Sequence, residues 1–157
     1  MGRVKVSLVA RAPLEKLYEM AHVIEDYPGY IPALRKVRVI ERSTDGSFVR
    51  AEWHAIARLL GATRNLVWVQ DDNWDDSRLV CRVSLHSGNE MKELKGELAF
   101  RPHPKGTEMV FDVDFRVEHP FMTPIIHRLL DQVMRKNNES MLMGLKRKAE
   151  QEFWEQW

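Results

Sequence analysis

The sequence has almost no cysteine: Cys81 is the only one among its 157 residues. A single thiol cannot form an internal disulfide or a multi-thiolate metal site, which excludes disulfide scaffolds, zinc fingers and iron–sulfur clusters. No second histidine or thiolate stands at metal-ligand spacing from any of the histidines. We therefore expect no metal and no cofactor, and a reducing, cytoplasmic location.

The sequence also lacks long apolar runs and an excess of one charge. No window approaches the roughly 18 consecutive apolar residues typical of a membrane span, and the alternating first residues predict no secretory signal. Lys and Arg total 24 against 23 Asp and Glu, a net charge of +1, so we do not expect a nucleic-acid partner. GxSxG, P-loop and GxGxxG motifs are absent, which removes the markers of triad hydrolysis, phosphate cradling and dinucleotide binding.

What the sequence does have is alternation of apolar and polar residues. Apolar residues at positions 4, 6, 8 and 10 predict a first strand with one buried face. Between Lys36 and Glu118, segments of the same period are separated by turn signals such as TDGS at 44–47, SGN at 87–89 and PKG at 104–106. These segments predict six more strands, whose common apolar face needs a covering layer.

Helical periods flank this strand-rich region. Leu14, Leu17 and Ala21 predict a short helix after the first strand, and the prolines of EDYPGYIPALRKV limit the next one to a turn or two. A long period from Pro124 to about Phe153 predicts a helix of about 45 Å that crosses the sheet. We predict an α+β fold in one domain, residues 1–157: a seven-stranded antiparallel sheet curved around a long C-terminal helix, with two short helices after strand one.

The predicted inner surface contains small and polar residues. On a helical wheel, Asn137 lies near the centre of the apolar stripe of the last helix. The small or polar residues on the two facing layers are Ala51, Ala55, Ala57, Cys81, Gly96, Ser140 and Gly144. This composition is consistent either with close docking of the helix on the sheet or with a cavity between them. Asn137 itself would bond either neighbouring backbone or a ligand.

Residues 4–42 with the motifs APLEKLYE and EDYPGYIP, residues 106–117 beginning with GTEMV, and residues 134–150 of the last helix resemble one known family. It is the START-like, helix-grip (SRPBCC) superfamily, and its coenzyme-Q-binding and polyketide cyclase/dehydrase branch in particular. VKVSLVARAPLEKLYEMAHVIEDYPGYIPALRKVRVIER is similar to the family's start of strand, Ala-Pro, helix, Asp-x-Tyr-Pro and Pro-x-Val. GTEMVFDVDFRV resembles its final strand and MRKNNESMLMGLKRKAE its closing helix, and the match covers nearly all of residues 3–150. The resemblance implies a helix-grip fold with an apolar cavity between sheet and helix.

The first functional hypothesis is non-catalytic binding or transport of a hydrophobic small molecule such as an isoprenoid quinone, a lipid or a polyketide-like compound. An inner face with almost no ionisable residues suits retention, with Asn137 or Ser140 bonding the polar end of the ligand. We assign no catalytic residue. The candidate ligand-binding residues are Tyr18, Tyr30, Trp53, Trp68, Leu94, Leu98, Phe111, Phe115, Val133, Asn137, Ser140 and Met141.

The second hypothesis is a polyketide aromatase/cyclase or dehydratase, a lyase-type enzyme in which Tyr18 or Tyr30 orients a carbonyl. Cyclases that the chain resembles generally rely on an inward arginine or histidine in the middle strands. The stretch NLVWVQDDNW has none. Arg64 or His54 would enter the interior only if the assigned strand faces were one residue out of register. The pattern does not decide which face of its strand Trp68 occupies, because Leu66 with Trp68 and Val67 with Val69 are equally apolar.

The third hypothesis, implied by ribosome-associated relatives in the same branch, is an interaction module for a macromolecule. Its candidate surface is the basic set Arg35, Lys36, Arg38, Arg42, Lys146, Arg147 and Lys148. Separately, two apolar loop tips would frame a pocket mouth, tuck under the sheet edge or touch a membrane transiently. The tips are Leu59 with Leu60 and Phe121 with Met122.

Overall fold

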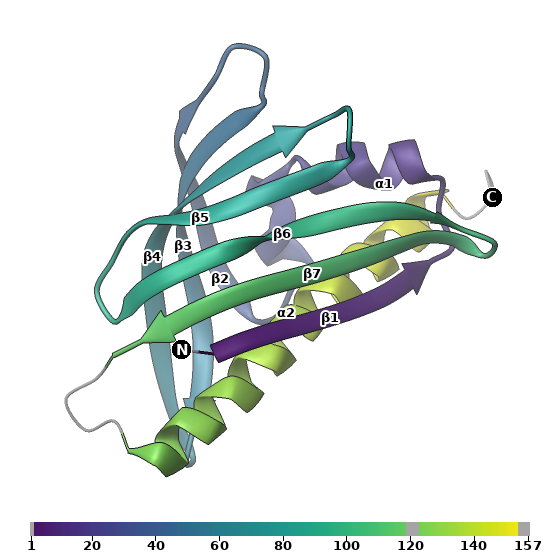
Figure 1. The fold of residues 1–157 in the computed structure, drawn as a ribbon. Coiled ribbons are helices and arrows are strands. Elements are labelled where there is room, and N and C mark those ends of the chain that lie inside the picture. Colours follow the sequence, from purple (N-terminus) through teal and green to yellow (C-terminus); the bar gives the residue numbers. More distant parts are fainter. Residues whose placement is uncertain (1, 119–122, 154–157) are drawn as a thin grey trace.

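A computed structural model describes residues 2–118 and 123–153, and its centre is one antiparallel sheet (Figure 1). The sheet has seven strands in the order β1-β7-β6-β5-β4-β3-β2, which confirms the predicted number. The strands are β1 (Gly2–Ala10), β2 (Leu34–Arg42), β3 (Phe48–Leu59), β4 (Ala62–Asp75), β5 (Val80–Gly88), β6 (Met91–His103) and β7 (Gly106–Val117). From β2 to β7 each strand pairs with the next along the chain, and β1 then pairs with β7.

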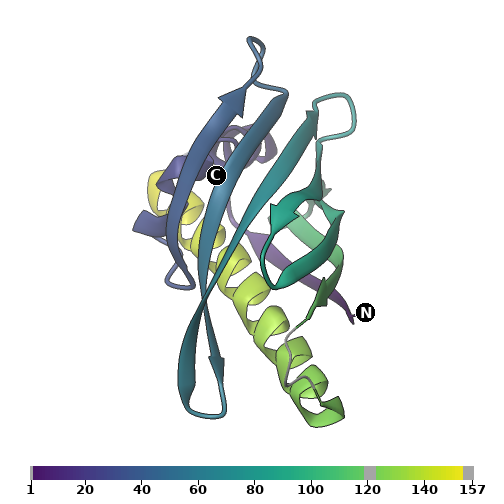
Figure 2. The same ribbon diagram turned by 90° about the vertical axis from the view of Figure 1, so that its left-hand side faces the viewer.

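Three helices accompany the sheet. The short helix α1 (Leu14–Ala21) and the 3-10 helix η1 (Ile24–Gly29) lie between β1 and β2, as predicted. The long helix α2 (Pro124–Phe153) begins where Pro124 suits a first turn and Thr123 Oγ1 accepts from the N–H of Ile126 at 3.2 Å. It crosses one side of the curved sheet obliquely, so the fold is a helix grip (Figures 1 and 2).

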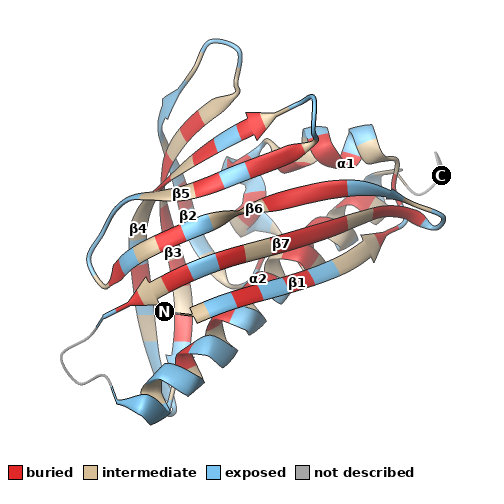
Figure 3. Ribbon diagram, viewed as in Figure 1, coloured by how far each residue is buried: buried red, intermediate tan, exposed pale blue. Residues whose placement is uncertain are grey.

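Burial alternates along the strands, which identifies the face that the helix covers (Figure 3). On β3 the odd positions from Val49 to Ala57 are buried and the residues between them face outward. On β4, Leu66 is buried whereas Val67 is 39% exposed. Leu66, Trp68 and Gln70 therefore face inward, and the assigned face of β3 is in register with the sequence prediction.

Helix α2 contributes a buried row that begins at Leu130 and continues through Met134, Asn138 and Leu142. Further along, Gly144 lies so close to the segment after η1 that a Cβ there would be 2.6 Å from Ile31 Cγ1 and 2.7 Å from the Tyr30 carbonyl oxygen. Close docking is thus realised at the C-terminal half of α2. Among the described residues, no helix is long and apolar enough to cross a membrane.

Candidate ligand-binding cavity

A cavity of about 70 Å³ lies between the inner face of the sheet and the middle of α2. Its lining is apolar except for three amide side chains and the indole N–H groups. The lining residues are Ala33, Leu34, Trp53, Ala55, Leu66, Trp68, Gln70, Met91, Leu94, Phe111, Val113, Met134, Asn137, Asn138 and Met141. We call this space the interior cavity.

Half of the predicted ligand-binding residues meet in this cavity. They come from five elements far apart in the sequence, β3, β4, β6, β7 and α2, and they are Trp53, Trp68, Leu94, Phe111, Asn137 and Met141. Because each of these strands presents alternate residues inward, one wall collects side chains from four of them. The small residue Ala55 leaves part of the volume unfilled.

The two adjacent asparagines of α2 have different roles. Asn137 Nδ2 donates to the carbonyl oxygen of Ile56 at 3.0 Å, so this amide bonds neighbouring backbone, one of the two alternatives considered above. Asn138 is only 9% exposed, and its Nδ2 has no hydrogen-bond partner among the described residues. A buried amide N–H without an acceptor is costly, so Asn138 presents an unused donor to the interior cavity.

A second unused donor lies on the sheet wall. Trp53 Nε1 is buried and has no partner among the described residues. The ring of Trp53 is nearly parallel to that of Trp68, its cross-strand neighbour, with 6.4 Å between centroids and 7° between planes. Tyr27 packs against the Trp53 ring at 5.9 Å. The cavity thus combines flat aromatic walls with two N–H groups that need an acceptor oxygen.

Three inward residues of β4 form a directional hydrogen-bond chain. Trp68 Nε1 donates to Gln70 Oε1 at 3.0 Å, and Gln70 Nε2 donates to Asp72 Oδ1 at 2.7 Å. An indole only donates, so the Gln70 amide must turn its oxygen to Trp68 and its nitrogen to Asp72. Burial raises the pKa of Asp72 to about 7. A carboxyl group that titrates near neutrality is therefore one amide away from the cavity.

The cavity is smaller than the roughly 300 to 1,000 Å³ typical of small-molecule sites. Three of its wall residues, Met91, Met134 and Met141, are methionines. Methionine is unbranched and adapts to irregular shapes, so movement of these side chains is the least costly way to enlarge the space. Occupation by a ring-sized ligand therefore requires rearrangement of the methionine wall.

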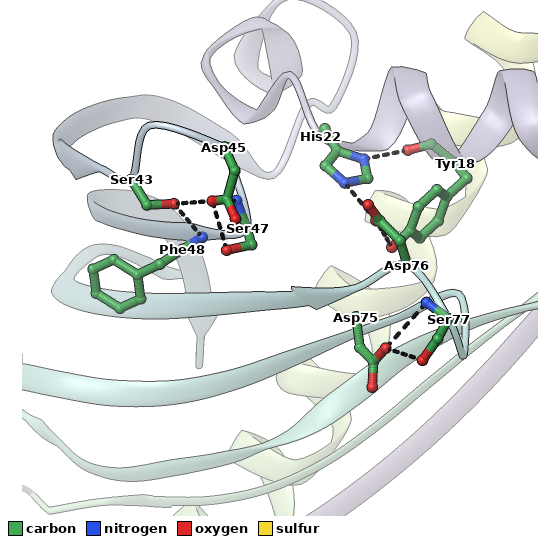
Figure 4. A network of polar contacts seen from close by, with 9 residues as sticks. All are labelled: Tyr18, His22, Ser43, Asp45, Ser47, Phe48, Asp75, Asp76 and Ser77. Atoms are coloured by element: carbon green, nitrogen blue, oxygen red, sulfur yellow. Dashed lines mark hydrogen bonds and ion pairs between the residues drawn. The ribbon is translucent and has the colours of Figure 1, made fainter.

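Tyr18 does not line the cavity; it belongs to a polar network near the β4–β5 turn (Figure 4). Its hydroxyl donates to Asp76 Oδ1 at 2.8 Å, and its backbone oxygen accepts from His22 Nδ1 at 2.7 Å. The His22 ring stacks on Trp74 with 3.7 Å between centroids. In the neighbouring β2–β3 turn, Asp45 accepts from the hydroxyl and backbone N–H of Ser47. The Tyr18 and His22 contacts connect α1 to the β4–β5 turn, whereas the Asp45 bonds close the β2–β3 turn on itself.

The other five predicted residues also lie outside the cavity lining. Leu98 and Phe115 are fully packed in the core, and Ser140 is half-buried on α2. Tyr30 buries a hydroxyl with no partner among the described residues, and burial raises its pKa above the ordinary value. Val133 lines an adjoining groove at the free edge of β3.

The residues considered for catalysis and for macromolecular binding lie elsewhere. Arg64 forms an ion pair with Glu90, and His54 bonds Glu52 on the outer face of β3. Four cations of the basic set are paired with acids: Arg38 with Glu52, Arg42 with Glu25, Lys146 with Glu150 and Lys148 with Glu152. This pairing reduces the net positive charge of that surface. Phe121 and Met122 lie outside the described residues.

The sequence interpretation missed two polar residues of the cavity, Gln70 as a ligand contact and Asn138. Asn138 continues the four-residue spacing of Leu130 and Met134. This spacing on one side of the helix was a signal in the sequence that Asn138 is buried. Gln70 follows Leu66 and Trp68 at period two, but the opposite face offered Val67 and Val69 as an equally apolar alternative. Burial of Leu66 and Gln70 in the folded protein decides between the two faces.

Comparisons with known proteins agree with the observed fold. No curated protein matches the chain. The chain is similar in structure to TTHA0849 from Thermus thermophilus (25% identity, TM-score 0.84, covering 94% of this chain and 96% of the other). It is also similar to the Zhui aromatase/cyclase from Streptomyces sp. R1128 (18% identity, TM-score 0.82, covering 94% of this chain and 93% of the other). A START superfamily protein from Mycobacterium smegmatis is similar as well (18% identity, TM-score 0.76, covering 96% of this chain and 99% of the other). Residues 1–150 match the protein family described as polyketide cyclase/dehydrase and lipid transport, and the chain belongs to this family.

Proposed function

We propose that the protein binds a hydrophobic small molecule bearing a carbonyl or similar acceptor oxygen, without transforming it. Isoprenoid quinones and polyketide-like compounds are the ligand types that fit this description. Apolar lining supplies the affinity, because each buried apolar group removed from water contributes favourably. Carrier or storage function follows from retention of the ligand between the sheet and α2.

The observation that carries the proposal is the pair of unused donors in one apolar space. Asn138 Nδ2 on the helix and Trp53 Nε1 on the sheet both lack acceptors among the described residues. Both groups only donate, so they select an oxygen that accepts. A ligand carbonyl would remove the cost of leaving them unpaired, whereas a hydrocarbon would not.

The experiment compares 2-methyl-1,4-naphthoquinone with 2-methylnaphthalene, which lacks the two oxygens, by isothermal titration calorimetry. We expect the wild type to prefer the quinone by roughly tenfold, about the effect of one buried hydrogen bond. Asn138→Leu, which leaves Trp53 Nε1 in place, should reduce this preference and keep its affinity for the hydrocarbon. Asn65→Leu, at an exposed position on β4, is the matched control.

Native mass spectrometry followed by organic extraction gives an independent result, because it needs no choice of probe. A stoichiometric apolar compound in the extract would support the proposal and identify the natural ligand. A protein that releases no such compound and binds neither probe would refute it.

A second candidate function, aromatase/cyclase or dehydratase activity, is supported by the buried carboxyl of Asp72. Through Gln70 it is linked to Trp68 on the cavity wall, and a group with a pKa near 7 is suited to proton transfer at neutral pH. The discriminating measurement is whether the extracted compound, or a linear poly-β-ketone, is converted on incubation. Loss of conversion in Asp72→Asn with unchanged ligand affinity would favour the enzyme; no conversion by the wild type would favour the carrier.

We also propose that the hairpin tip between β3 and β4 contacts membranes transiently. Leu60 at this tip is 74% exposed, and Leu59 lies beside it. Leu60 lines a hollow together with Ile126 and Leu130 of the N-terminal half of α2, and Ile125 on that helix is exposed as well. Such apolar tips bind the boundary between headgroups and acyl chains. Liposome flotation tests this step, and wild-type protein that never floats with neutral or anionic vesicles would contradict it.

A further inference from the structure

A second hollow, which we call the edge groove, adjoins the interior cavity and holds about 380 Å³. It lies between α2, the segment before β2 and the part of β3 that β2 does not cover. Its lining consists of Pro32, Ala33, Ile56, Arg58, Leu59, Leu60, Leu129, Gln132, Val133, Lys136 and Asn137. Ala33 and Asn137 line both the edge groove and the interior cavity, so the two spaces meet at these residues.

The groove exists because β2 begins late. Leu34 pairs with Ala55, so β3 has no strand partner on that side beyond Ala55. Ile56 is still satisfied there: its N–H donates to the Ala33 oxygen at 2.9 Å and its oxygen accepts from Asn137. Backbone groups alternate in direction along a strand, so the N–H of Arg58, two residues on, faces the same open side. That side therefore offers an amide donor as well as the Arg58 side chain.

The charges in the groove are all positive. Arg58 and Lys136 are both exposed, and neither has an acidic partner within the described part of the chain. This distinguishes them from arginines such as Arg50, which bonds Asp71 at 2.7 Å. The remaining lining is apolar apart from Gln132 and Asn137. An apolar trough with two unpaired cations is complementary to a molecule with an apolar body and an anionic end.

We propose that the edge groove binds the carboxylate of an apolar carboxylic acid whose hydrocarbon part extends past Asn137 into the interior cavity. Arg58 and Lys136 pair with the carboxylate. This inference rests on the proposed function and adds a second recognition element to it. The planar guanidinium of Arg58 matches a carboxylate in a two-point hydrogen bond, and Lys136 adds a point charge from the helix side.

The size of the groove favours a single-chain acid over a two-chain phospholipid. Its volume is at the low end of the range for drug-sized sites, and the interior cavity adds little until its methionines move. Because both cations are exposed, their contribution is modest and sensitive to salt. We therefore expect an acid to bind roughly tenfold more tightly than the corresponding alcohol at low ionic strength.

The test measures the affinities of dodecanoate and 1-dodecanol by calorimetry at low and high salt. The variants are Arg58→Gln, Lys136→Gln and the double substitution, and the controls are Lys95→Gln and Arg101→Gln, exposed cations on β6. We expect the double variant to bind the acid only as tightly as the alcohol, with its affinity for the alcohol unchanged. The controls should retain the preference, and salt should reduce it in the wild type and in the controls alike.

Three results would overturn the inference. The first is equal affinity of the wild type for acid and alcohol, with no effect of the double substitution. The second is loss of binding to phosphatidylglycerol vesicles in the double variant while its preference for dodecanoate persists. That result would mean that the two cations bind anionic lipid headgroups and not the carboxylate of a bound acid. The third is no binding of either C12 compound. If the naphthoquinone still binds in that case, the proposed function stands without this inference; if it does not, both fail.

Discussion

Gln70 and Asp72 share a buried hydrogen bond on the inner face of β4, with Gln70 Nε2 donating to Asp72 Oδ1 at 2.7 Å. One bond does not compensate for burial of the carboxylate, so the pKa of Asp72 rises from 3.8 to about 7. The folded protein then binds a proton that the unfolded chain releases above about pH 4. The free energy of unfolding must fall as pH rises through this interval.

We expect Asp72→Asn to remove this loss of stability. The free energy of unfolding of the wild type should fall by up to about 4 kcal/mol between about pH 4 and pH 7, at about 1.36 kcal/mol per unit of pKa shift, and should change little above about pH 7. The variant keeps an oxygen for Gln70 Nε2 and should be more stable than wild type at about pH 8 and similar at about pH 4. Urea denaturation at these two pH values and at one between them measures this, with the exposed Asp114→Asn as control. Parallel pH profiles for wild type and Asp72→Asn would contradict it.

Replacing each of the two asparagines of α2 by leucine should have a different effect on the free energy of unfolding. Asn137→Leu removes the donor to the Ile56 oxygen and should lower the free energy of unfolding by about 1 kcal/mol. Asn138→Leu removes a buried donor that has no partner among the described residues and should leave stability unchanged or raise it by about 1 kcal/mol. Urea denaturation of both variants checks this. Equal losses would show that Asn138 also has a stabilising partner in the folded protein.

Gly144→Ala should destabilise the protein even though alanine is the better helix former by about 1 kcal/mol. The added methyl group would lie 2.6 Å from Ile31 Cγ1 and 2.7 Å from the Tyr30 oxygen, so α2 must shift. We expect a net loss of about 2 kcal/mol by thermal or urea unfolding. Ser140→Ala on the same helix is the control and should not destabilise. A more stable Gly144→Ala would mean that α2 docks less closely here.

Leu60 occupies a backbone conformation that suits asparagine better. Its φ of 51° and the φ of 80° at Gly61 belong to a tight hairpin turn for which Asn-Gly is preferred. Leu60→Asn should raise stability by about 0.5 to 1 kcal/mol in urea denaturation. The same variant should float less with liposomes, because it loses an exposed apolar side chain. Unchanged flotation would show that the hairpin tip does not bind the membrane.

Much of the fold was predictable because its signals are local. Period two placed Val49, Trp53 and Ala57 on one buried face, and the helical period gave α2 its limits at Pro124 and Phe153. Where two faces of a strand were equally apolar, as on β4 around Trp68, the local signal could not decide. Burial against the rest of the protein decided in favour of Leu66 and Gln70.

The candidate site was predictable only in its general position, between the sheet and the helix. A helical wheel selected Asn137, yet one step along a helix turns a side chain by about 100°. Both asparagines line the cavity, but Asn137 Nδ2 donates to the Ile56 oxygen, and the donor without a partner among the described residues is Asn138 Nδ2. Tyr18 was a candidate for orienting a ligand carbonyl, but in the tertiary structure its hydroxyl donates to Asp76.

The sequence by itself determined the order of strands and helices and the apolar character of the space between them, because one-sided burial imposes a period on neighbouring residues. Only the tertiary structure decided which donors of the described residues remain without acceptors, that Asp72 is buried beside Gln70, and that Arg58 and Lys136 meet at one groove. These properties depend on contacts between residues far apart in the chain, and no local period encodes such contacts.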